Sequence, residues 1–118
     1  MPQITLEHST HFDTTDFRAL ALEIHQLCDT HVGATIQSCK TRVVRVENLI
    51  IADGAPEQAM AHCDLRILSG RTQEQKTALA DAVQQAMLKH LIQYDGPRQI
   101  SVEIGNLDMP NYRKDVLG

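Results

Sequence analysis

The chain has 118 residues, 42% of them hydrophobic and 22% charged, with a net charge of -4 at pH 7. This apolar content excludes a disordered polypeptide, and the length predicts a single domain over residues 1–118. The acidic balance and the scattered basic residues argue against nucleic-acid binding. No apolar run is long enough to cross a membrane and no leader segment is evident, so we expect a soluble, cytoplasmic protein whose partners are small molecules or proteins.

The cysteines carry no pattern of a disulfide framework or a redox motif. Cys28, Cys39 and Cys63 are odd in number and lack C-x-x-C spacing. This usage is typical of reduced thiols in a cytosolic protein, and we expect all three in the core.

The first segment, residues 2–8, alternates apolar and polar side chains as a half-buried strand does. Pro2, two residues before Ile4 and four before Leu6, lies on the same side of this strand as they do. We therefore expect the proline on the buried side of the strand.

A helix is predicted next, with apolar residues at helical spacing over residues 17–31. Its N-cap is expected at Asp13 or at a following threonine, and Gly33 is a natural end point. The β-branched residues 39–46 then predict a second strand that carries Lys40 and Arg42 on one face.

The second half repeats this order after a connector with room for a short strand. Residues 59–67 alternate as a third strand, and a second helix follows, capped by Thr72 with Gln75 at the capping-box position. The sequence YDGP ends this helix, residues 99–104 form a fourth strand, and the last residues have no clear period and are expected to form an arm.

The doubled β-α-β order predicts an α+β fold, a four-stranded mixed sheet with two helices on one face. The other face is then either solvated or covered by neighbouring subunits. Two architectures fit this pattern: a ferredoxin-like domain, for which the sequence offers no binding motif, and a tautomerase-like one.

The chain resembles the 5-carboxymethyl-2-hydroxymuconate isomerases of the tautomerase superfamily over nearly its whole length. The likeness lies in the order and spacing of MPQITLE, CKTRVVRV followed by ADG, LRILSGRTQEQK and ISVEI. The resemblance implies a homotrimer that needs no cofactor or metal, in which the initiator methionine is removed and Pro2 is the catalytic base.

The residue type suits that role on chemical grounds. If Met1 is retained, the proline nitrogen is part of an amide bond. If Met1 is removed, the proline nitrogen is a free secondary amine. An ordinary α-amino group has a pKa of about 7.7–8.0, so a base at neutral pH needs a lower one. Burial and nearby cations, with Arg71, Lys40 and Arg42 as candidates, both lower an amine's pKa.

Arg71 is the leading candidate for binding a substrate carboxylate. It lies between the third strand and the second helix, near a helix N-terminus that favours anions, and its guanidinium can make two parallel hydrogen bonds. The family also has an arginine here. Where the family carries two arginines separated by one residue, this chain has Lys40 and Arg42. This difference leaves the identity of the substrate open.

The resemblance implies proton transfer within 5-carboxymethyl-2-hydroxymuconate, in the degradation of homoprotocatechuate-type aromatics. Two alternatives stay open: a tautomerase of another, smaller 2-oxo acid, and a non-catalytic oligomeric module that binds small molecules. A metal site is not expected, because neither His8 with His11 nor His62 with Asp64 has a third ligand at a suitable spacing.

Overall fold

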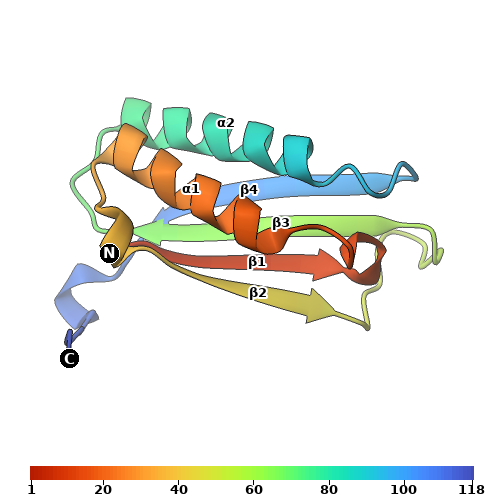
Figure 1. Cartoon of the computed structure of the whole chain (residues 1–118), viewed down its shortest axis with the longest axis horizontal. Helices are drawn as coiled ribbons and strands as arrows, with labels where there is room; N and C mark the ends of the chain where they lie inside the picture. Colours follow the sequence, from red (N-terminus) through yellow and green to blue (C-terminus); the bar gives the residue numbers. More distant parts are fainter.

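The computed structural model describes residues 1–118 as two β-α-β units joined by a connector (Figure 1). Three short 3-10 turns lie between or after the regular elements. In chain order the strands and helices are β1 (Gln3–Ser9), α1 (Phe17–Val32), β2 (Lys40–Val46), β3 (Ala59–Ile67), α2 (Gln73–His90) and β4 (Arg98–Asn106).

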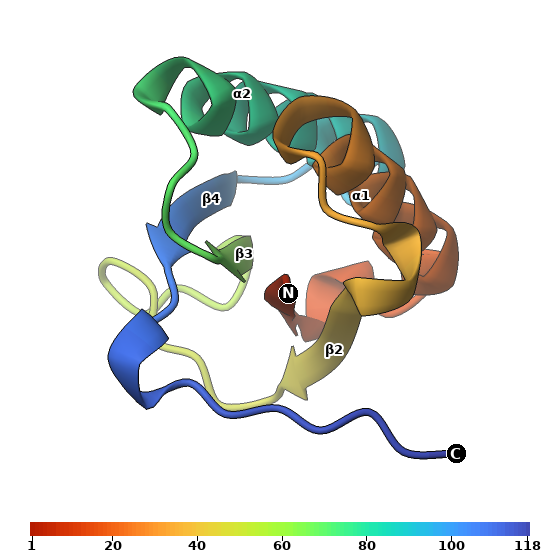
Figure 2. The same ribbon diagram turned by 90° about the vertical axis from the view of Figure 1, so that its left-hand side faces the viewer.

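The strands form one mixed sheet in the order β2-β1-β3-β4. Each unit contributes a parallel pair, and the two units join through the antiparallel pair of β1 and β3. Both helices cover the same face (Figures 1 and 2), as the right-handed crossover rule predicts. The predicted fold class is therefore confirmed.

The connector of residues 47–58 contains no strand, although its sequence is long enough for a short one. No helix in the structure has the length and hydrophobicity that a membrane span requires.

The helix ends follow local rules with one correction. Asp16, not Asp13 or a threonine, caps α1, and its carboxylate accepts a hydrogen bond from the Ala19 amide at 2.9 Å. Asp13 was the wrong choice because the 3-10 turn Thr10–Phe12 extends the chain beyond β1, and Asp13 ends that turn and pairs with Arg45. The predicted capping box of α2 is present.

The core lies between the helices and one face of the sheet. Pro2 and the even-numbered residues of β1 point into it, together with the odd-numbered residues of β3 and one stripe of each helix. Its fully buried members include Ile4, Leu6, Phe12, Leu20, Ile24, Cys28, Cys63, Leu65, Leu79 and Val83. This buried apolar surface is the main stabilising term of the fold.

Strand directions bring distant segments together at one end of the sheet. The parallel register places Lys40 beside Gln3, and the antiparallel register places Arg66 on the other side of Gln3. The start of β1, the start of β2 and the loop after β3 therefore meet at this end. The C-terminal arm, residues 107–118, also passes here, on the side away from the helices (Figure 2).

Candidate active site

Pro2 is held rigidly at the start of β1. Its side chain is fully buried, and its carbonyl oxygen accepts a hydrogen bond from the Lys40 amide at 3.2 Å. The alternation of β1 places it on the same face as Ile4, as its sequence parity predicted. The backbone before Gln3 is thus fixed by the sheet on one side and by the core on the other.

The α-amino group that precedes Pro2 lies among cations. Burial lowers the pKa of the Met1 amino group below its ordinary value, and the positive charges of Arg71, Lys40 and Lys114 lower it further. An ammonium ion is disfavoured here because it would lose hydration and meet like charges. An amine at this end of the chain is therefore biased toward its neutral, basic form.

Arg71 follows Gly70, whose φ of 106° lies in the left-handed region that glycine adopts without strain. The Arg71 Nε donates to the Val32 carbonyl at 3.0 Å and one terminal nitrogen donates to the Leu68 carbonyl at 3.2 Å. These bonds tie the guanidinium to the end of α1 and leave its other terminal nitrogen without a partner. Arg71 can therefore hold an anion from a fixed position.

Lys40 and Arg42 share the open face of the sheet, opposite Gln3 and Thr5 respectively. The Lys40 ammonium donates to the Ser38 carbonyl and meets no carboxylate. Arg42 is exposed, makes no side-chain hydrogen bond and lies two positions farther along β2. The structure brings Arg71 and Lys40 together at the amino terminus, and it leaves Arg42 apart from them.

One residue of this cluster was missed by sequence reasoning. Lys114, in the C-terminal arm, places its Nζ 2.6 Å from Met1 Sδ. The arm has no periodicity, so no pattern fixed its course, and the adjacent basic pair Arg113 and Lys114 was its one visible signal.

The cations at this end form no ion pair with an acidic residue of the chain. Every ion pair in the structure lies elsewhere, between Arg45 and Asp13 or Glu47, and between Glu23 and the end of α2. A protein with a net charge of -4 thus keeps a group of cations without carboxylate partners. Such a group favours the binding of an anionic ligand.

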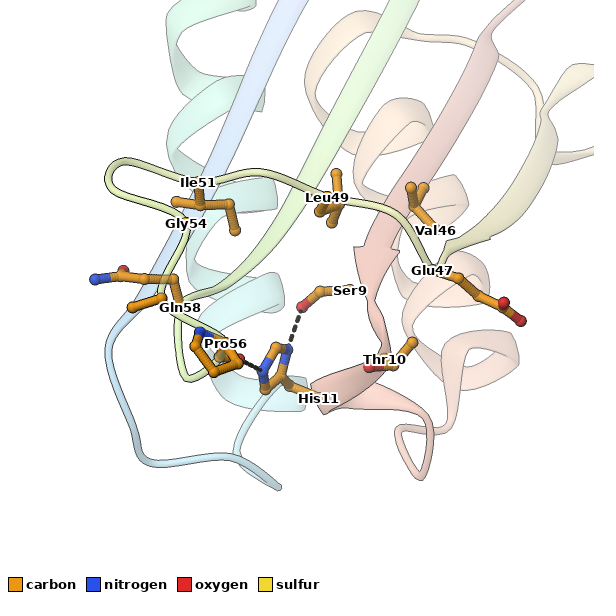
Figure 3. Close-up of a pocket in the computed structure, with 11 residues that line it drawn as sticks. Ser9, Thr10, His11, Val46, Glu47, Leu49, Ile51, Gly54, Pro56 and Gln58 are labelled. Atoms are coloured by element: carbon orange, nitrogen blue, oxygen red, sulfur yellow. Dashed lines mark hydrogen bonds between the residues drawn. The ribbon is translucent and has the colours of Figure 1, made fainter.

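A cavity of about 290 Å³ lies at the opposite end of β1 (Figure 3). His11 points into it, with one ring nitrogen 3.0 Å from Ser9 Oγ and the other 2.9 Å from the Pro56 carbonyl. Both ring nitrogens are occupied within the chain. This cavity is remote from the amino terminus and gathers no comparable charge.

Other reactive side chains are not arranged for catalysis. Burial raises the pKa of the Cys28 and Cys63 thiols to about 12, so neither is a thiolate at neutral pH. All three cysteines are free and buried, as predicted. No three His, Cys, Asp or Glu side chains come together as metal ligands.

The arrangement of two β-α-β units in one mixed sheet, with both helices on one face, defines the class: this is the tautomerase superfamily fold. A family profile described as 5-carboxymethyl-2-hydroxymuconate isomerase matches residues 2–115. The chain belongs to this family, whose members are tautomerase-type isomerases.

Solved structures agree in fold. A 5-carboxymethyl-2-hydroxymuconate isomerase from Deinococcus radiodurans R1 superimposes with a TM-score of 0.87 at 21% identity, covering 97% of this chain and 88% of the other. A 5-carboxymethyl-2-hydroxymuconate delta-isomerase gives 0.72 at 18% identity, covering 100% and 89%. A fused 4-OT described as a symmetric trimer gives 0.73 at 14% identity, covering 92% and 90%. A search of curated protein sequences found no match.

Proposed function

We propose that the mature chain begins at Pro2 and that the Pro2 amine is the base in an isomerisation of 5-carboxymethyl-2-hydroxymuconate or a related dienol. The observation that carries this proposal is the cluster of cations without carboxylate partners around the amino terminus of a chain in this isomerase family. In the proposed mature chain, the Pro2 amine takes the place of the Met1 amine among these cations. The proposal requires that Met1 be removed, and the small proline ring in second position suits that processing.

The proton moves within the substrate. The Pro2 nitrogen takes the proton of the 2-hydroxyl group, and the electrons of the O–H bond form the C2 carbonyl. The C2=C3 double bond moves to C3=C4, and the electrons of the C4=C5 double bond become available at C5. The resulting ammonium returns the proton to C5, which gives the conjugated 2-oxo enoate. The proton that the base removes is returned to the substrate and the reaction has no net change of oxidation state, so it requires no redox cofactor.

The cations have complementary roles in this proposal. Arg71, fixed by Val32 and Leu68, binds the carboxylate next to the 2-hydroxyl group. Lys40 lies beside the amine and stabilises the negative charge that grows on the dienolate oxygen. Arg42, farther along the open face, provides an exposed positive charge for the carboxylate of the substrate's carboxymethyl group.

We also propose that the chain assembles as a homotrimer in the cytoplasm and acts in the degradation of aromatic compounds. The open face of the sheet has no helix over it, and the edge strand β2 exposes Val43 and Val44. Unprotected edges favour pairing between chains. The fused 4-OT of the same fold is described as a symmetric trimer, which supports this assembly. Free cysteines agree with a reducing compartment.

A direct assay distinguishes the proposed reaction from the alternatives. We expect the purified protein to convert 2-hydroxymuconate, and more efficiently its 5-carboxymethyl derivative, to the 2-oxo enoate, measured as loss of the dienol absorbance. Conversion of only smaller 2-oxo acids would assign a different tautomerase activity. Binding of these acids without conversion would instead support the non-catalytic module.

A further inference from the structure

The C-terminal arm is anchored across the start of β1. The buried Leu107 donates its backbone amide to the Ile67 carbonyl at 2.7 Å, which starts the arm at the end of β3. Farther along, Gln3 Nε2 donates to the Tyr112 hydroxyl at 3.0 Å. These two attachments determine where the next residues lie, and they place Lys114 beside the amino terminus.

The arm and the sheet border an open cavity of about 440 Å³, within the range of about 300–1,000 Å³ that small-molecule sites occupy. Its charged lining residues are Lys40 from β2 and Arg113, Lys114 and Asp115 from the arm. Three cations against one carboxylate give this cavity an excess of positive charge. It is therefore suited to an anion of the size of a muconate.

Lys114 has no partner that would compete with such an anion. The residue is partly buried, and its one hydrogen-bond contact is the Met1 sulfur. When Met1 leaves, that contact is lost and the volume that Met1 filled opens next to Pro2. A partly buried ammonium without a partner is unfavourable, and a carboxylate in this volume would satisfy it.

Two uncharged groups in the same cavity also have unused hydrogen-bonding capacity. The Tyr112 hydroxyl accepts from Gln3 and still has its own hydrogen to donate. Gln3 Oε1 is buried and receives no hydrogen bond. A carboxylate can accept from the tyrosine, so the cavity offers a further donor besides its cations.

Arg71 and the arm that carries Lys114 reach the amino terminus from different layers of the fold. Arg71 is bonded to the end of α1 in the helix layer, whereas the arm runs along the open side of the sheet (Figure 2). We infer that Lys114 is a substrate-binding residue that takes the carboxylate remote from the 2-hydroxyl group, so that the site selects dienols with two or more carboxylates. This inference rests on the proposed function, which supplies the orientation of the substrate.

The variant Lys114→Gln tests this role in the mature protein, with Lys76→Gln on α2 as a control of equal charge change. At a pH above the acidic limb of the kcat/KM profile, where the amine is neutral with or without the Lys114 charge, we expect Lys114→Gln to raise KM for 2-hydroxymuconate about 10-fold or more. The kcat should be nearly unchanged, because a contact made equally before and during reaction is lost. For 2-hydroxypenta-2,4-dienoate, which lacks the remote carboxylate, KM should stay unchanged. Lys114→Arg should restore the low KM.

Identical kinetics of Lys114→Gln and Lys76→Gln on 2-hydroxymuconate would overturn the inference, and so would an equal loss on both dienols. Calorimetric titration with muconate, which has both carboxylates but no 2-hydroxyl group, separates binding from turnover. If the parent protein binds muconate about 10-fold more tightly than Lys114→Gln but isomerises neither dienol, the proposed reaction fails and the role of Lys114 in carboxylate binding stands. If the parent protein isomerises 2-hydroxymuconate but Lys114→Gln binds muconate equally well, only the role of Lys114 fails.

Discussion

Replacing Pro2 with alanine is expected to lower kcat/KM for 2-hydroxymuconate about 100-fold or more, because the catalytic base is lost from its fixed position. Alanine at the mature terminus still ends in an amine. That amine is primary, however, and it is no longer held by a ring buried in the core. A freer amine spends less time within reach of the substrate proton, so a reduced but measurable rate should remain.

The control for this substitution is a conservative change in the same strand. Ile4→Val removes one buried methylene from β1 and should leave kcat/KM within about threefold, at a cost of about 0.5–1.5 kcal/mol in the free energy of unfolding. Sedimentation should give the same assembly for both variants. Turnover by Pro2→Ala at the parent rate would place the base elsewhere.

Replacing Arg71 with alanine is the second large effect, with an expected fall of about 100-fold in kcat/KM. The guanidinium binds the substrate in the proposed reaction, and its charge lowers the pKa of the terminal amine. Removing this cation therefore raises the amine's pKa. The amine then stays protonated to a higher pH, and the acidic limb of the kcat/KM profile should move to higher pH.

Two matched variants separate charge from position. Arg71→Lys keeps a cation and should leave the acidic limb close to its original pH, although the paired hydrogen bonds to a carboxylate are lost. Arg42→Ala removes an arginine that is exposed and does not act on the amine, so the acidic limb should stay at its original pH. A limb that moves equally in Arg42→Ala and Arg71→Ala would show that Arg71 has no special proximity to the base.

The sequence predicted those features of the structure that depend on a few neighbouring residues. Alternation in residues 2–8 predicted that Pro2 faces the core, and the structure confirms it. The capping box at Thr72 and the left-handed end of α1 at Gly33 were readable because each depends on a few neighbouring residues. Arg71 could be placed near the start of α2 for the same reason.

Features that depend on distant contacts could not be read in this way. The stretch HFDTTDF holds several residues able to cap a helix, and the choice of Asp16 depends on the turn that precedes it. The course of the arm depends on Leu107 and Tyr112, which bind residues far away in the sequence. The position of Lys114 beside the amino terminus consequently followed from no local pattern, although the basic pair Arg113 and Lys114 is visible in the sequence.

The central claim is that a free Pro2 amine does the chemistry, and intact-mass spectrometry of an active preparation tests it most directly. The mass of the purified protein, measured on the same sample that isomerises the dienol, should be lower than that of the full sequence by one methionine residue, and activity should scale with this species. A fully active preparation in which every chain retains Met1 would contradict the account, because its proline nitrogen would be an amide without basic character.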